Sequence, residues 1–135
     1  MTQKDKELLL KDLSTRLPYG VKVAFFNEDL TYHSEPKTLI QIECINNLNY
    51  SRLEDKDGNS TIIEFVKPYL FPMLSMTDEQ YEEYHNTCNV GLNRQGDEVY
   101  YNCDESIDWL NANHIDYRGL IEKGLAIDAT GLNIY

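Results

Sequence analysis

The chain has 135 residues and carries a net charge of −11 at pH 7. The length suits one domain, which we expect to span residues 1–135. The charge makes direct nucleic-acid binding an improbable function, because a negative surface repels phosphate backbones. Hydrophobic residues make up 41% and charged residues 26% of the chain. This composition is typical of globular proteins and excludes a disordered chain.

Negative charge is concentrated in the C-terminal half of the sequence. Residues 1–22 carry a net charge of +2, residues 23–74 carry −4 and residues 75–135 carry −9. Tyrosine is over-represented, with ten copies against four Phe and one Trp. Its apolar ring and polar tip suit half-buried contact surfaces. These features favour contact with a basic partner protein, although acidic surfaces commonly serve solubility alone.

The sequence gives no sign of secretion or membrane insertion. Residues 1–7 are polar and charged, unlike the start of a signal peptide. No apolar run approaches the roughly 20 residues that a membrane span needs. We therefore expect a cytoplasmic protein, where an odd count of three cysteines favours free thiols.

A first helix is predicted near the N-terminus. Thr2 can cap this helix, and Asp5 is a weak capping-box partner. The helix should end near residue 15 or 16, because Pro18 disfavours helical geometry at the residue before it. Its apolar stripe is predicted at Leu9, Leu10, Leu13 and Leu17. Its polar side is predicted at Lys4, Lys6, Lys11 and Asp12.

Strand-like runs follow between residues 21 and 66. The clearest is 39–45, where Ile40, Ile42 and Cys44 share one predicted buried face. Shorter runs at 21–26, 30–33, 50–53 and 61–66 predict an antiparallel meander of three to five strands. A bulge or loop is expected at Asn46, Asn47 and Asn49.

Two closely spaced prolines follow the last of these runs. Pro68 and Pro72 bracket three apolar residues, and proline cannot donate a backbone hydrogen bond. The pair therefore argues against a central strand or a long helix. We expect an extended apolar connector that packs on the sheet.

The C-terminal half predicts short helices. Thr77 and Gln80 form a capping box for a helix that runs to about residue 86. Asp104 is expected to cap a third helix, and Asp116 a short fourth helix that stops at Gly124. Residues 88–103 fit a hairpin or a plain loop, and residues 128–135 are expected to form a loose tail.

These elements together predict an α+β fold. It consists of an N-terminal helix, a small antiparallel sheet or partly open barrel, and short C-terminal helices packed on one face.

No group of ionisable side chains predicts catalysis or metal binding. A zinc site would need His85, Cys88, Cys103 and His114, of which only the first two stand at short spacing. A cysteine nucleophile would need a histidine and an orienting group nearby, which no spacing indicates. Asp104, Glu105 and Asp108, with Asp97 and Glu98 nearby, could hold a cation or act as an acid–base pair. Asp104 is better explained as a helix N-cap, and Glu105 and Asp108 favour the start of the same helix. The scattered glycines form no phosphate-binding loop, so we expect no cofactor.

The chain resembles a known protein family in four segments, at residues 6–13, 17–22, 67–77 and 109–126. Together they are similar to a family of short uncharacterised proteins from gut anaerobic bacteria and their phages or mobile elements. The segments cover about a third of the chain, and the strand region 23–66 is not matched. The resemblance implies a bacterial or phage cytoplasmic setting, and it brings no activity or site residue.

The sequence leaves three functions open. The first is a non-enzymatic interaction or accessory protein, the second is a small enzyme or ligand-binding domain with a site built from distant residues, and the third is a nucleic-acid charge mimic. Arg118 can recognise a carboxylate or phosphate, or can pair with Asp116 or Glu122. The expected interaction surface comprises Tyr81, Tyr84, Tyr100, Tyr101, Asp116, Tyr117 and Arg118.

Overall fold

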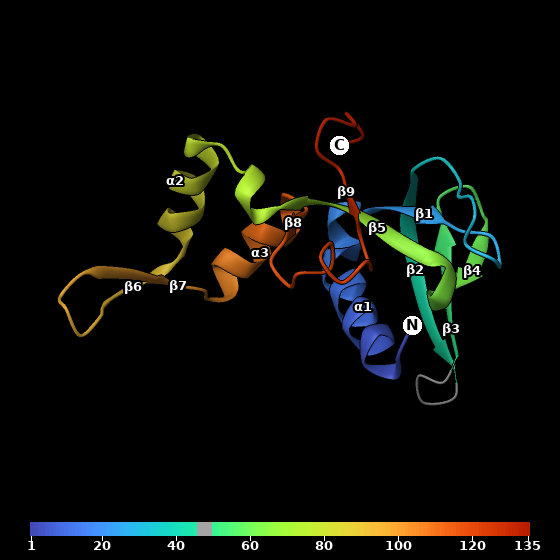
Figure 1. Ribbon diagram of the computed structural model, residues 1–135, viewed down its shortest axis with the longest axis horizontal. Coiled ribbons are helices and arrows are strands. Elements are labelled where there is room, and N and C mark those ends of the chain that lie inside the picture. The colour runs from blue at the N-terminus through green and yellow to red at the C-terminus, as the bar shows by residue number, and fades with distance from the viewer. Residues whose placement is uncertain (46–49) are drawn as a thin grey trace.

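Helix α1 (Gln3–Arg16) opens the chain, whose computed structural model describes residues 1–45 and 50–135 (Figure 1). The Thr2 hydroxyl accepts a hydrogen bond from the Asp5 N–H, and the Asp5 carboxylate accepts one from the Thr2 N–H, both at 3.1 Å. This capping box confirms the predicted start of the helix. The helix ends at Arg16, within the predicted range, and a 3-10 turn (Leu17–Tyr19) follows.

A mixed seven-stranded sheet forms the centre of the fold. Its order is β4-β3-β2-β1-β5-β8, with β9 also paired to β5. Strands β1 to β5 are antiparallel neighbours, whereas β8 and β9 run parallel to β5. The α+β class and the N-terminal helix are confirmed, but the sheet is larger than the predicted meander because the chain returns to β5 twice. The strands are β1 (Lys22–Phe25), β2 (Lys37–Ile45), β3 (Tyr50–Asp55), β4 (Ser60–Ile62), β5 (Val66–Pro72), β8 (Ile115–Asp116) and β9 (Ile127–Asp128).

Strand β5 corrects the interpretation of the two prolines. It contains both Pro68 and Pro72 and is a central strand, with β1 on one side and β8 and β9 on the other. The backbone groups between the prolines make the long-range bonds. Phe71 N–H donates to the His114 carbonyl at 2.8 Å, and the Leu70 carbonyl accepts from Ala129 N–H at 2.8 Å. Both prolines are tolerated in this central strand because the N–H group that bonds to His114 belongs to Phe71, which lies between Pro68 and Pro72.

Strand β2 also departs from its predicted pattern. Its register with β3 shifts between Leu39 and Gln41, which is the signature of a β-bulge. Leu39 is therefore buried while Ile40 is exposed. Beyond the bulge Ile42 packs against the core as predicted, whereas Cys44, nearer the end of the strand, is exposed rather than buried. The bulge or loop predicted at Asn46, Asn47 and Asn49 lies outside the described residues.

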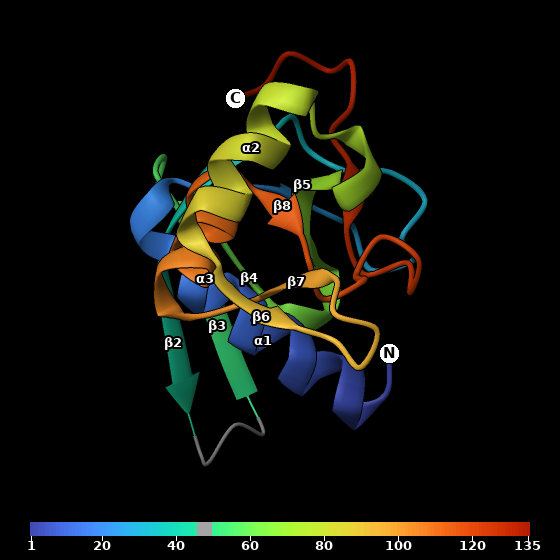
Figure 2. The ribbon, with the colours of Figure 1, turned by 90° about the vertical axis from the view of Figure 1, so that its left-hand side faces the viewer.

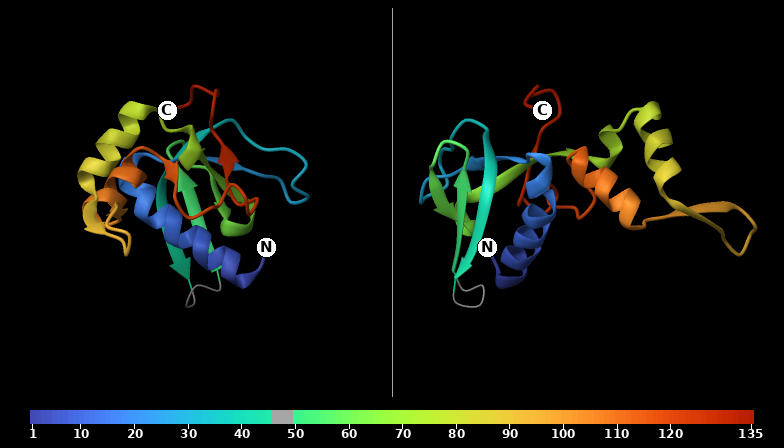
Figure 3. Two further views of the ribbon diagram at one scale, coloured as in Figure 1. Left: turned by 60° about the vertical axis from the view of Figure 1, so that its left-hand side comes forward. Right: turned by 180° about the vertical axis from the view of Figure 1, so that it is seen from behind.

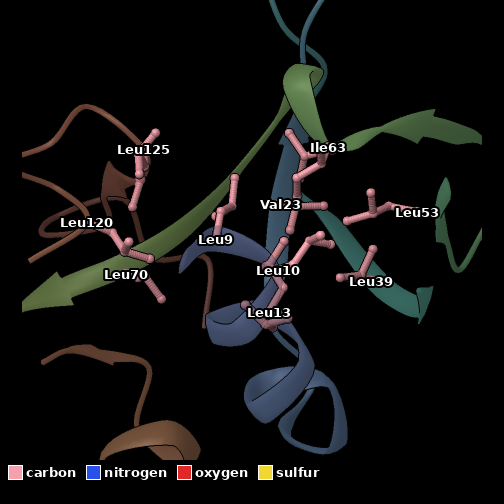
Figure 4. Packing of buried hydrophobic residues seen from close by; sticks show 13 residues of the cluster. Leu9, Leu10, Leu13, Val23, Leu39, Leu53, Ile63, Leu70, Leu120 and Leu125 are labelled. Atoms are coloured by element: carbon pink, nitrogen blue, oxygen red, sulfur yellow. The ribbon is translucent and has the colours of Figure 1, made fainter. Parts of the chain in front are cut away.

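The main apolar core lies between α1 and the sheet (Figure 4). Leu9, Leu10 and Leu13 point from the helix toward the strands, as their spacing predicts. Each leucine buried in this way contributes about 1.5–3 kcal/mol to folding. The sheet and the C-terminal turn supply Val23, Leu39, Leu53, Ile63, Leu70, Leu120 and Leu125 to the same cluster.

The predicted polar side of α1 is wrong at Asp12, which is fully buried. Its carboxylate accepts a bond from Arg16 Nε at 2.9 Å and another from Arg118 Nη1 at 2.8 Å. Arg16, also fully buried, donates from Nη2 to the Ile115 carbonyl at 2.6 Å. Arg118 thus pairs with Asp12 and with neither of the acidic residues expected for it. The Asp12 carboxylate thus joins α1 to the turn after β8, and its partner Arg16 joins α1 to β8.

The C-terminal half contains two helices and a hairpin. Helix α2 (Asp78–Thr87) starts at the predicted capping box, where Gln80 N–H donates to the Thr77 hydroxyl at 3.2 Å. Residues 88–103 form a hairpin of β6 (Asn89–Leu92) and β7 (Glu98–Tyr101), not a plain loop. Helix α3 (Asp104–Ala112) follows, with Cys103 at its N-cap in place of the predicted Asp104.

The predicted fourth helix is a series of turns. The Asp116 carboxylate accepts bonds from Leu120 N–H and Ile121 N–H, both at 2.9 Å, so it caps this segment as expected. The turns end at Gly124, whose φ of 71° is the left-handed conformation that glycine favours.

Residues 128–135 are anchored to the sheet, in contrast to the expected loose tail. Ala129 is buried and bonded to β5. The Tyr135 hydroxyl accepts a bond from Lys22 N–H at 2.8 Å and donates one to the Tyr69 carbonyl at 2.7 Å. This hydroxyl therefore links β1 and β5.

None of the helices that the structure describes has the length and apolar character that crossing a bilayer requires.

The Asp12→Asn variant is expected to lose about 3–5 kcal/mol of unfolding free energy, because the buried Arg16 guanidinium loses its counter-charge. Urea denaturation followed by circular dichroism measures this loss. Glu43→Gln is the control, since it removes a longer contact of 3.9 Å to Arg52 between half-exposed groups. It should cost less than about 1 kcal/mol. Equal losses in the two variants would contradict the assigned role of Asp12.

Candidate functional site

Four elements extend away from the rest of the molecule. We call residues 78–112, which comprise α2, β6, β7 and α3, the arm, and the remainder the body. The arm projects to one side in both Figure 1 and Figure 3, with the β6–β7 hairpin farthest from the sheet. In Figure 2, α2 and the hairpin lie in front of α3 and the body. The two helices pack on each other instead of jointly covering a sheet face as expected.

Aromatic contacts hold α2 to the hairpin and to α3. The Tyr84 hydroxyl donates to Asn102 Oδ1, directly after β7, and its ring lies 5.8 Å from the Trp109 ring. The rings of His85 and Tyr100 stack with centroids 4.0 Å apart. Burial raises the pKa of Tyr84 to about 12, so its hydroxyl keeps its proton and donates over the physiological pH range.

A separate contact fixes the start of the arm. The Tyr81 hydroxyl donates to the Met73 carbonyl at 3.0 Å, and both side chains belong to a cluster around Met76, Leu110 and Ile115. Ile115 lies in β8, so this cluster connects the arm to the body. These contacts confirm that Tyr81 and Tyr84 share a face with the preceding methionines.

Most of the net charge of the chain lies on the arm. Of its ionisable side chains, nine are acidic and one, Arg94, is basic, which gives −8 of the total −11. All nine acidic residues are exposed. In the part of the chain that the structure describes, none of them forms an ion pair. They are Asp78, Glu79, Glu82, Glu83, Asp97, Glu98, Asp104, Glu105 and Asp108.

Apolar side chains are exposed on the hairpin next to this charge. Val90 pairs with Tyr100 across the two strands, and Leu92 lies two residues along the same face. Their exposed fractions are 56%, 43% and 69%, which is unusual for apolar side chains in a strand. On the opposite face, Tyr101 is half exposed and its ring lies over Gly91, so a larger residue at position 91 would displace this ring.

The seven residues predicted as one interaction surface fall into three places. Tyr100 and Tyr101 are exposed on the hairpin, while Tyr81 and Tyr84 are half-buried within the arm. The remaining three belong to the body. Asp116 is buried in its cap, Arg118 pairs with Asp12, and the Tyr117 hydroxyl donates to Asn111 Oδ1 at 3.0 Å.

Sequence reasoning missed the apolar part of the hairpin. Val90 and Leu92 were expected in a strand arm or a loop, with no sign that their side chains would face solvent. A signal for this exposure was present in the sequence. Val90 and Leu92 alternate along a short strand, and no other predicted strand was available to cover their face.

The cysteines and histidines do not converge. Cys88 Sγ donates to the Tyr84 carbonyl at 3.3 Å, and Cys103 Sγ donates to the Thr87 carbonyl at 3.0 Å. Among the described residues, no three His, Cys, Asp or Glu side chains come close enough together to hold a metal ion.

Comparisons with models of protein families, with curated proteins and with solved structures each found no match for this chain.

His114 stands at the root of the arm, between α3 and β8. Its backbone has a φ of 59°, in the left-handed region that few non-glycine residues adopt. Burial, with smaller effects from the positive charges of Arg16 and Lys22, lowers the pKa of its ring to about 4. The ring is therefore neutral at physiological pH.

The lowered pKa of His114 makes stability depend on pH. Between about pH 6.5 and 4 the unfolded chain binds a proton that the folded chain does not, so stability falls as the pH falls through this range. The expected contribution is about 2–3 kcal/mol. Urea denaturation at pH 7 and pH 4 should show a larger acid loss for the native chain than for His114→Asn, whose side chain tolerates a positive φ. An identical acid loss in both proteins would contradict a buried neutral imidazole.

Proposed function

We propose that this chain is a non-enzymatic interaction protein whose arm binds a basic partner protein. The observation that carries the proposal is the combination of nine exposed, unpaired acidic residues with an exposed apolar hairpin on one projecting element.

The two parts of the arm suit the two parts of a protein interface. Interface centres are enriched in aromatic side chains such as Tyr100 and are more apolar than their polar rims, and Val90 and Leu92 supply such apolar surface here. Long-range attraction between a negative arm and a positive partner speeds association and selects against acidic partners. The contacts of Tyr81, Tyr84 and His85 keep α2 and the hairpin in a fixed arrangement, which lowers the entropy lost on binding.

A nucleic-acid charge mimic is a narrower form of the same proposal. In that form, the basic surface of the partner is one that otherwise binds phosphate backbones. DNA would then compete with this chain for the partner, and the competition would weaken steeply as salt is added.

The test compares two variants with equal charge change. The arm variant carries Glu→Gln at 82, 83 and 98, and the control carries Glu→Gln at 7, 28 and 35, which are exposed on the body. Each immobilised protein captures proteins from an extract of the cells that express the chain, and affinity is then measured with the purified partner. The arm variant should bind about tenfold or more weakly, given about 0.5 kcal/mol per charge.

Two further readouts complete this experiment. The control variant should bind like the native chain, and binding of the native chain should weaken as salt rises. Equal affinity of both variants, or an extract from which the native chain retains no protein, overturns the proposal.

A further inference from the structure

A cavity of about 490 Å³ lies beside the root of the arm. Its lining comes from distant parts of the sequence, including Phe71 at the end of β5, Gln80 in α2, His114 before β8 and Tyr135 in the C-terminal segment. A volume of this size exceeds that of a single water molecule by an order of magnitude and is within the range of small-molecule sites.

Among the described residues, no Asp, Glu, Lys or Arg side chain lines this cavity, although the chain has 35 such residues. The polar lining consists of hydroxyl and amide side chains together with the imidazole of His114, which are Ser75, Gln80, Asn113, His114, Thr130 and Tyr135. A charged ligand would therefore lose its hydration without gaining a counter-charge. The lining selects for an uncharged ligand.

Three aromatic rings, those of Phe71, His114 and Tyr135, contribute to the lining of the cavity. The Tyr135 ring stacks on the His114 ring with centroids 3.6 Å apart and an interplanar angle of 15°. The Phe71 ring is tilted against Tyr135 at 5.8 Å. Planar rings pack favourably on such surfaces, so the walls favour a planar ligand.

Two side-chain amides in the lining, those of Gln80 and Asn113, each use one of their polar atoms in a hydrogen bond within the protein. The other polar atom of each amide is available to a ligand. Gln80 Oε1 accepts from Thr77 N–H at 2.9 Å, and Asn113 Nδ2 donates to the Trp109 carbonyl at 2.9 Å. Among the described residues, the Gln80 Nε2 donor and the Asn113 Oδ1 acceptor make no other bond. A complementary ligand offers one acceptor and one donor.

His114 supplies a second, independent indication of a ligand. The residue is only 9% exposed, and its Nδ1 atom has no hydrogen-bond partner among the described residues. A buried polar atom without a partner costs about 1–3 kcal/mol, and the left-handed backbone of this residue adds further strain. Strained backbones of this kind cluster at active sites and ligand clamps.

We infer that this cavity binds a small, planar, uncharged molecule that carries an N–H donor beside a C=O acceptor, as a nucleobase or a lactam does. The inference stands on the lining of the cavity and does not depend on the proposed partner of the arm.

The experiment titrates the protein with uracil and with orotate, which has the same ring and an added carboxylate, while ¹H–¹⁵N spectra are recorded. Uracil is expected to shift the amide signals of Gln80, Asn113 and His114 in a saturable manner. Orotate should bind at least tenfold more weakly because of its charge. Nicotinamide and 2-pyridone, which also pair an amide with a ring, are tested in the same way.

Variants test the assigned contacts. Gln80→Glu keeps the oxygen that caps α2 but removes the Nε2 donor, so it should weaken uracil binding about tenfold. Glu79→Gln, at the exposed neighbouring position, should leave binding unchanged. His114→Asn, which tolerates the positive φ, should also weaken binding, and it serves if Gln80→Glu does not fold.

Three results overturn the inference. They are the absence of saturable shifts with all three uncharged probes, orotate binding as tightly as uracil, and unchanged uracil affinity in variants at both Gln80 and His114.

Discussion

The fold depends on one buried carboxylate that is shared by two guanidinium groups. Asp12 bonds Arg16 within α1 and Arg118 beyond β8, two positions more than 100 residues apart in sequence. Burying three charges carries a large desolvation cost, which the short hydrogen bonds offset only while all partners are present. The network therefore ties together elements from the two ends of the chain. Through it, the C-terminal turn and β8 are bonded directly to α1.

The body and the arm differ in how they place their apolar and ionisable side chains. The body buries a few of its ionisable groups, such as Asp12, Arg16 and the capping Asp116, and its main apolar core lies between α1 and the sheet. The arm does the reverse, because its acidic residues face solvent and part of its apolar surface is uncovered. A small apolar cluster, the aromatic stacks and the hydrogen bonds of Tyr84 and Cys103 link its elements.

Local signals in the sequence were sufficient for local structure. The capping boxes at Thr2 and Thr77 and the glycine stop at Gly124 place the element ends correctly, because each depends on neighbours within a few residues. Long-range pairing could not be predicted in the same way. The burial of Asp12 depends on Arg118, and the central position of β5 depends on the carbonyl of His114 and the N–H of Ala129. The exposure of Ile40 depends on a bulge. Of the candidate surface, the exposed tyrosines of the hairpin were identified, while its apolar residues and the internal role of Arg118 were not.

The hairpin also bears on how copies of the chain behave toward one another. In the described part of the chain, β6 and β7 pair only with each other, so each retains an outer edge beside exposed Val90 and Leu92. Such edges template intermolecular sheet growth unless charge opposes it. Repulsion between the acidic arms provides that opposition at neutral pH. Acidification protonates these carboxylates and weakens the repulsion, so we expect the uncovered edges of the hairpin to promote self-association more at low pH than at neutral pH.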